Sequence, residues 1–453
     1  MGARLTDSAE YAHLWGTDEV RAVFDQGARR QRWLDILVAL AEAQAGLGII
    51  PRRAADAIAA NARAERLDLE LLAAETRRTS HSTLGFIAAA KAALPEEAAE
   101  YVYYGVTVQD LTDTWTVLAA RDVMAIVWRD LRTLARLLVD LAKCHRSTVM
   151  PGRTHAQPGA PITFGWKVAS WADEVGRHLE RLDQARRRWP VGQLGGAVGT
   201  LGFFGTDGPP LRAEFCRRLE LSDPGISWLT SRDRLVEQAA FLALVTGTLA
   251  RVGNEVMELQ RAEIGEVTER IDANVVGSIT MPHKRNPERS EHLDTLARLV
   301  RAQAGVLMEG MVQIHERDGR GWKAEWPAFG EACLLSSTAL ALGIDLVTGL
   351  EVHSDRMRAH VETDDGLLSE RVLSAYARRA GKHRAQADLQ RVLAAAHRDG
   401  RSLVDAVESA GLLDGGELRA IVGDGQLPGA EHAVDTVTER LAGFLAASSE
   451  RWP

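Results

Sequence analysis

Apolar residues recur at helical spacing along most of the 453-residue chain, and the alternation typical of strands is almost absent. In the segment 33–47, small and branched apolar residues share one face of the expected helix: Leu34, Leu37, Leu40 and Ala41. Longer segments with the same periodicity cover roughly 111–147, 158–188, 232–270, 289–316 and 328–350. The pattern therefore predicts an all-α protein.

The length of these segments predicts the architecture. They exceed the usual globular helix of about 11–12 residues, and their periodicity suits a long helical bundle. Shorter helices are expected before about residue 105 and after about residue 351. We therefore predict three helical domains: an N-terminal domain 1–105, a central long-helix bundle 106–350 and a C-terminal domain 351–453. Helices this long present more apolar surface than one bundle covers, which favours self-association.

Composition narrows the class of protein. A net charge of -8 argues against a nucleic-acid partner or an anionic membrane, because both favour basic surfaces. Three widely separated cysteines (Cys144, Cys216 and Cys333) indicate neither a disulfide framework nor a metal site. The first residues lack the apolar core of a signal peptide, and apolar runs such as 239–250 are short for a bilayer. We expect a cytoplasmic protein with no metal and no membrane partner.

The segment 277–287, GSITMPHKRNP, has the densest set of chemically active residues. A glycine permits close backbone approach, and backbone N–H groups can form a nest for an anion. Lys284 supplies a point charge and Asn286 an amide that both donates and accepts. A polar surface turn is the bland alternative. The composition favours a flexible loop that closes over an anionic ligand.

This segment resembles the signature loop of the fumarase/aspartase superfamily, usually written GSSxMPxKxNP. Ile279 departs from the second serine. The resemblance implies that Ser278, six residues before Lys284, is the catalytic base, and that Lys284 and Asn286 hold substrate carboxylates. It extends from Leu14 to about Arg379 and implies an all-α fold with no cofactor. It also implies a homotetramer in which three chains build each active site.

Two further segments resemble the other blocks of the superfamily. The stretch 104–113, YGVTVQDLTD, resembles the block that binds a carboxylate, with Thr107 as the hydroxyl; Val108 departs from the usual serine. The stretch 152–157, GRTHAQ, resembles the block of the general-acid histidine. The resemblance implies His155 as the acid, with the neighbouring Arg153 and Thr154 binding substrate. Thr200, in a glycine run that is not a GxGxxG dinucleotide loop, is a further substrate contact by resemblance.

The chemistry explains why these residue types belong together. Removing a proton beside a carboxylate builds a dianionic aci-carboxylate, which a lysine and fixed donors stabilise. A serine acts as a base only where its alkoxide is stabilised, and a histidine titrates near the working pH. We therefore expect β-elimination from a small substituted succinate (a dicarboxylate), with release of fumarate.

The branch of the superfamily is harder to assign. Glu291, thirteen residues after Ser278, and His81 fall where adenylosuccinate lyases keep an acid-orienting glutamate and a second histidine. Trp322 and Trp326 stand where those enzymes bind a phosphate, and two indoles cannot replace a hydroxyl and a guanidinium there. Arg317 either lines the pocket or pairs structurally. A small substrate such as nitrosuccinate, with C–N cleavage, is the leading hypothesis.

Three alternatives remain open. Adenylosuccinate lyase is one. The stretch 322–326, WKAEW, resembles 3-carboxy-cis,cis-muconate cycloisomerases, which is the second. A structural protein of the crystallin kind is the third, and the presence of Ser278, Lys284, Asn286 and His155 together argues against it.

Overall fold

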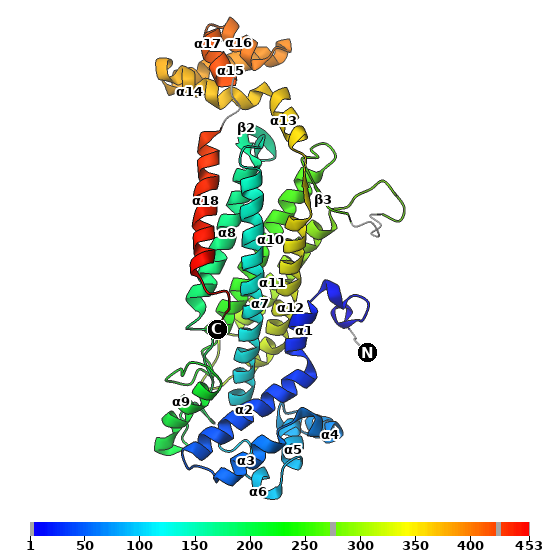
Figure 1. The fold of residues 1–453 in the computed structure, drawn as a ribbon, viewed down its shortest axis with the longest axis vertical. Coiled ribbons are helices and arrows are strands. Elements are labelled where there is room, and N and C mark those ends of the chain that lie inside the picture. Colours follow the sequence, from blue (N-terminus) through cyan, green and yellow to red (C-terminus); the bar gives the residue numbers. More distant parts are fainter. Residues whose placement is uncertain (1–3, 272–277, 423–426, 453) are drawn as a thin grey trace.

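The computed structural model describes residues 4–271, 278–422 and 427–452. It is 69% helical and elongated, with a long helical bundle in the middle and a smaller helical group at each end (Figure 1). The prediction of an all-α fold is confirmed. Four short strands form two small antiparallel pairs within the described residues.

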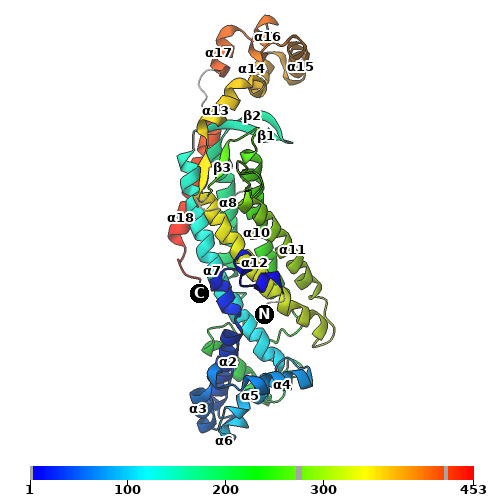
Figure 2. The same ribbon diagram turned by 90° about the vertical axis from the view of Figure 1, so that its right-hand side faces the viewer.

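Five long helices make the bundle and lie side by side in both views (Figures 1 and 2). They are α7 (Val108–Cys144), α8 (Phe164–Ala185), α10 (Asp233–Gln260), α11 (Glu288–Glu309) and α12 (Gly319–Thr348). Large side chains such as Trp128, Phe164 and Trp171 fill the core between them. The helix expected at 328–350 begins at Gly319 in the structure. Pro327 lies inside α12 and does not end the helix there.

A second apolar core lies at the end of the bundle where α7 begins. Shorter helices surround it: α2 (Gln26–Gly46), α3 (Arg52–Asn61), α4 (Leu69–Thr79), α5 (Leu84–Ala92), α6 (Glu96–Ala99) and α9 (Gly208–Arg218), with the 3-10 turns Ala64–Arg66 and Gly205–Asp207. Leu194, Phe215 and Trp228 belong to this core although they lie inside the predicted central domain. The predicted boundary near residue 105 therefore omits residues about 191–228, which pack with the N-terminal group.

The beginning of the chain packs on the bundle instead. The 3-10 turns Leu5–Asp7 and Ala12–Leu14 precede α1 (Asp18–Phe24). Val20 of α1 is fully buried in the bundle core, and the Thr17 amide donates to Ser337 of α12.

The opposite end carries α13 (Ser354–Thr363), the 3-10 turn Asp365–Leu368, α14 (Ser369–Ala380), α15 (Lys382–Asp399), α16 (Leu403–Ser409) and α17 (Gly415–Val422). Helices α14 to α17 enclose a small core of their own, which includes Val372, Leu403 and Val407, whereas Met357 of α13 belongs to the bundle core. The last helix, α18 (Pro428–Ala447), returns along α7 and α8 (Figure 1). Leu441 and Trp452 join the bundle core. Residues 428–452, which the prediction placed in the C-terminal domain 351–453, therefore lie against the bundle in the structure.

The two strand pairs position the candidate site. β1 (Val149–Thr154) and β2 (Gln157–Thr163) form a hairpin after α7, where the periodicity predicted helix from residue 158. Pro158 and Pro161 explain the difference, since a proline in a helix interior removes a backbone hydrogen bond. β3 (Val267–Glu269), which precedes the signature segment in the chain, pairs with β4 (Leu350–Val352).

Two helices, α10 and α12, are long and apolar enough to cross a membrane by length and composition. Their most apolar windows are 67% and 61% buried inside the bundle. Packing in the core accounts for their hydropathy. The apolar run 239–250 lies inside α10, which extends over 28 residues.

Candidate functional site

Thr107 begins the longest helix of the bundle. It is the N-cap of α7, and its amide donates to the Asp110 carboxylate at 2.9 Å. The same carboxylate accepts the amides of Gly195 at 2.7 Å and Gly196 at 3.0 Å, so it ties the glycine run to the helix start. Burial raises the pKa of Asp110 to about 7, although the three backbone donors favour its charged form.

The glycine run packs closely on the chain before Thr107. Gly105 has φ +75°, and a Cβ there would meet the rings of Phe203 and Phe204 at 2.5 and 2.4 Å. Only glycine accepts both the backbone angle and the contact. This packing brings the exposed Thr200 to the same end of the bundle.

Arg317 and His81 lie at this end too. Arg317 donates to the Gly196 carbonyl at 3.3 Å, and its guanidinium interacts electrostatically with Asp110. The His81 Nδ1 accepts the Thr83 amide at 3.3 Å, which assigns the proton of the neutral ring to Nε2. Burial is the main cause that raises the pKa of Tyr103, and the charge of Asp110 is the second; Thr83 acts in the opposite direction. His81, Thr107, Thr200 and Arg317 therefore form one locus.

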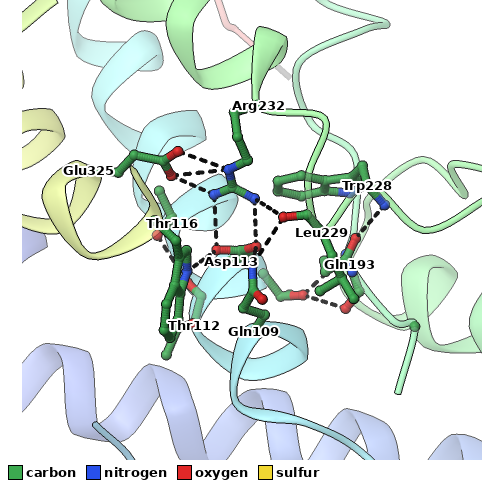
Figure 3. Close-up of polar contacts among 12 residues, drawn as sticks. Gln109, Thr112, Asp113, Thr116, Gln193, Trp228, Leu229, Arg232 and Glu325 are labelled. Carbon is green, nitrogen blue, oxygen red and sulfur yellow. Dashed lines mark hydrogen bonds and ion pairs between the residues drawn. The ribbon is translucent and has the colours of Figure 1, made fainter. Parts of the chain in front are cut away.

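A buried ionic cluster surrounds Asp113, three residues after Asp110 on α7 (Figure 3). The Arg232 guanidinium, fully buried, contacts Asp113 of α7 at 2.8 Å and Glu325 of α12 at 2.9 Å. Burial opposes the charge of Arg232, but Asp113 and Glu325 raise its pKa above the usual value. Burial also disfavours the charged form of Glu325, and it therefore raises the pKa of that carboxyl. The cluster joins α7, α10 and α12.

Trp322 belongs to this cluster and Trp326 borders it. The Trp322 indole N–H donates to Asp113 at 3.0 Å, and the side chain is 5% exposed. Trp326 stacks edge-on against Trp322 at 4.9 Å and is 42% exposed. Trp322 therefore has its one donor engaged in the core, and Trp326 presents an apolar ring to the surface.

His155 occupies the tip of the β1–β2 hairpin. His155 and Ala156 both have positive φ, 51° and 61°, so the two-residue turn between Thr154 and Gln157 is of the type that favours Asn-Gly. A histidine and an alanine in that conformation carry backbone strain, which is found at functional sites. Thr154 and His155 are exposed in the single chain.

Arg153, next to the turn, is engaged by a buried acid. Its guanidinium makes two hydrogen bonds to Glu266, at 2.7 and 2.8 Å. Glu266 is fully buried and also contacts the His360 Nδ1 at 2.7 Å. The predicted contact of Arg153 with substrate stays a prediction, and in the structure its guanidinium ties the hairpin, next to the turn, to Glu266.

The signature segment follows β3. Ser278 is half-buried, and its Oγ accepts the Met281 amide at 3.0 Å. Lys284 is exposed, and the Asn286 amide donates to Glu288 at 3.0 Å. Glu291 is exposed in the first turn of α11, and no bond joins it to His155 among the described residues of one chain. Gly277, the first residue of the motif, lies outside the described residues.

The predicted residues therefore fall at three loci: the start of α7, the hairpin tip, and the segment before α11. At 1.5 Å per residue the 37 residues of α7 span about 55 Å, and Thr107 and the hairpin lie beyond its opposite ends. One chain does not bring Thr107 and His155 together. Among the described residues, no group of three or more His, Cys, Asp or Glu side chains could hold a metal ion.

Sequence reasoning missed Asp110, Glu266 and the Asp113–Arg232–Glu325 cluster. Asp110 had a local signal, since an acid three residues after a threonine is typical of a capping box. The others had none, because their partners lie from 93 to 119 positions away along the chain.

Comparison with known proteins agrees with these blocks. A family model described as Lyase matches residues 15–302. The chain is 42% identical over 386 residues to the N-acetyl-S-(2-succino)cysteine lyase of Dickeya dadantii, covering 85% of both proteins. It is 40% identical over 370 residues to the 3-carboxy-cis,cis-muconate cycloisomerase of Pseudomonas aeruginosa, covering 81% of both.

More distant relatives and a solved structure support the same assignment. The chain is 35% identical over 397 residues to the adenylosuccinate lyase of Methanocaldococcus jannaschii, covering 87% of this chain and 86% of that one. The crystal structure of the 3-carboxy-cis,cis-muconate lactonizing enzyme from Pseudomonas putida superposes with a TM-score of 0.86 at 34% identity, over 95% and 98% of the two chains. The chain belongs to the lyase family of the fumarase/aspartase superfamily.

Proposed function

We propose that this lyase removes a small substituent from a substituted succinate by β-elimination and releases fumarate. Ser278 takes the proton from the carbon beside one carboxylate, and the electron pair moves to form the double bond as the bond to the leaving group breaks. Lys284 and Asn286 stabilise the aci-carboxylate. Thr107 and Arg317 hold the other carboxylate, and His155 faces the leaving group.

The observation that carries the choice of a small substrate is the environment of Trp322. A nucleotide phosphate needs a hydroxyl and a guanidinium at this place, whereas the Trp322 N–H is bound to Asp113 and the ring is buried. The nearby Arg232 is neutralised by Asp113 and Glu325. An apolar rim with Trp326 at the surface suits a substituent that carries no phosphate.

The leaving atom is the finer part of the proposal. The relative that is 42% identical is named for a succinylated thiol, which favours sulfur as the leaving atom. Thiols ionise near pH 8.5, so a thiolate leaves with modest help from an acid such as His155. Nitrosuccinate, favoured by the sequence alone, is the second candidate, because nitrite is a still weaker base.

We further propose that the active site forms between copies of this chain in a homotetramer. The separation of Thr107 from His155 supports it, since one chain holds these two residues beyond opposite ends of α7. Exposed apolar residues along α10, α11 and the segment that follows supply a surface for a second copy: Leu244, Leu299, Val306, Met308, Met311, Val312 and Ile314. Helices α10 and α11 pack against each other, and extensive exposed apolar surface is typical of an interface.

The test is fumarate release from a panel that contains N-acetyl-S-(2-succino)cysteine, nitrosuccinate, adenylosuccinate, argininosuccinate and aspartate, followed with a coupled fumarase. Fumarate from either of the first two supports the proposal and names the leaving atom. Rapid turnover of adenylosuccinate would overturn the argument from Trp322. Lactone formation from 3-carboxy-cis,cis-muconate, with no fumarate from the panel, would establish a cycloisomerase instead.

A further inference from the structure

Helix α11 begins without a capping side chain of its own. Its N-cap residue is Pro287, which has no side-chain oxygen to accept the first free N–H groups of the helix. These groups are satisfied from another part of the chain. The Glu269 carboxylate accepts the Arg289 amide at 3.2 Å and the Ser290 amide at 3.0 Å, and it also accepts the Ser290 hydroxyl.

The position of Glu269 makes this cap unusual. Glu269 is the last residue of β3, before the signature segment, and Ser290 follows that segment. One carboxylate therefore joins the two ends of the loop that carries Ser278, Lys284 and Asn286. Glu269 is 3% exposed and Ser290 is fully buried, so water cannot replace either partner.

A second side chain bridges the same two ends. The Gln260 Oε1 accepts the Glu269 amide at 2.7 Å, and its Nε2 donates to the Arg285 carbonyl at 3.4 Å. Arg285 lies between Lys284 and Asn286 in the chain. The Arg289 guanidinium adds a bond to the Arg270 carbonyl at 2.8 Å. The far end of the loop is thus fixed by contacts to residues on its near side.

We propose that Glu269 is a positioning residue, which places Lys284 and Asn286 for the substrate carboxylate by capping α11 across the root of the signature loop. The inference rests on the proposed function of that loop. A carboxylate at a helix N-terminus interacts favourably with the helix dipole, so the cap holds its geometry best while it is charged. A neutral amide in its place keeps the size but turns one of the two acceptor atoms into a donor.

The experiment measures fumarate binding by calorimetry and turnover for Glu269→Gln, together with hydrogen exchange in residues 278–290. We expect fumarate affinity and kcat/KM to fall about 10-fold to 100-fold, the size of effect that a displacement of about 1 Å causes. Exchange at residues 284–290 should increase, while the thermal midpoint of the bundle changes little.

Glu174→Gln is the matched control. The Glu174 carboxylate lies on α8, accepts the Thr248 hydroxyl at 2.6 Å and pairs with Arg251 away from the loop. This variant should keep wild-type fumarate affinity. Ser290→Ala removes the hydroxyl donor and leaves both amides, so it should show a weaker effect of the same kind. If Glu269→Gln does not fold, Ser290→Ala tests the inference in its place.

The outcomes separate this inference from the proposed function. If wild-type protein neither binds fumarate nor acts on the panel, the proposed function fails, and the exchange data still decide whether Glu269 holds the loop end. If Glu269→Gln and Ser290→Ala bind fumarate as wild type does and show unchanged exchange at 284–290, Glu269 serves stability alone and the inference is overturned.

Discussion

Thr107 and His155 lie beyond opposite ends of the same helix, α7, and about 55 Å of helix separates them. Both belong to blocks that the family resemblance assigns to one active site. A rigid helix cannot bend to unite them, so the site is assembled from different copies if both residues act on one substrate.

Mixed oligomers test this arrangement. His155→Ala and Thr107→Val should each lower turnover by about 100-fold, the size of effect expected when a side chain that positions the substrate is lost. Co-expression of the two variants should restore activity at least about tenfold above either alone, because some sites then combine an intact Thr107 with an intact His155. The measurement is fumarate release by the co-purified mixture.

A pair from the same hairpin provides the control. Thr154→Val and His155→Ala lie on one tip, so no mixed site contains both intact residues, and co-expression should give no recovery. Recovery in this pair, or none in the first, would contradict assembly of the site from several chains.

Ser278→Ala tests the base. The Ser278 Oγ accepts one amide, from Met281, so its loss should hardly alter the thermal midpoint. Turnover should fall by about 100-fold to 10,000-fold, the contribution of a general base. The exposed Thr280, two residues along the same loop, gives the control variant Thr280→Ala. Near-normal turnover of Ser278→Ala would remove Ser278 from the mechanism.

Much of the fold could be predicted from the sequence because long apolar periodicity has few solutions. The segments 111–147 and 289–316 agree with α7 and α11 to within a few residues at most ends. The hairpin at 149–163 escaped prediction, since its strands are short and its turn, His155-Ala156, lacks the usual Asn-Gly signal. The packing of α18 against the bundle depends on contacts with α7 and α8, which are distant in the chain, so the local sequence does not predict it.

The candidate site divides in the same way. Motif blocks identified Ser278, Lys284, His155 and Thr107, but the motifs carry no information about the distances between them. Arg153 shows the limit, because its block suggests a substrate contact while its guanidinium is held by Glu266, 113 residues away. Contacts over such separations depend on packing, which only the structure provides.

Trp322 and Trp326 should behave differently although both are indoles in one helix. Trp322→Phe removes the hydrogen bond to Asp113 and leaves a buried carboxylate oxygen less satisfied, which should cost about 1–3 kcal/mol of unfolding free energy. Trp326→Ala removes a half-exposed ring and should change KM more than stability. Urea unfolding and substrate kinetics on both variants separate the roles, and a wild-type KM for Trp326→Ala would exclude it from the pocket rim.

Arg232→Met should be the most destabilising of these changes. It leaves the Asp113 and Glu325 carboxylates buried without their cation, a situation that costs about 3–5 kcal/mol. Glu325→Gln should cost less at neutral pH, since burial already raises the pKa of Glu325 and reduces what its charge contributes. Unfolding in urea ranks the two variants, and a smaller loss for Arg232→Met would show that the cluster is not held by its charges.

Asp110 should make stability depend on pH in the direction opposite to most carboxylates. Burial raises its pKa to about 7 in the folded chain, whereas an unfolded aspartate ionises near 3.9. Its protonated form therefore contributes stability fully below about pH 3.9, and this contribution is lost as the pH rises through 7. Between pH 5 and 7 the unfolding free energy of wild type should fall relative to Asp110→Asn by up to about 1.4 kcal/mol per pH unit. Urea titrations of both proteins at pH 5, 6, 7 and 8 measure the difference.

The contrast with Asp318 makes this test specific. Arg320 lowers the pKa of Asp318, so this carboxylate stays ionised above pH 5. The unfolding free energies of Asp318→Asn and wild type should therefore differ by a constant amount above pH 5. If the Asp110→Asn difference instead stays flat from pH 5 to 8, Asp110 is ionised throughout, and its three backbone donors outweigh its burial. The Gly195–Gly196 run would then be held to Thr107 by a charged carboxylate.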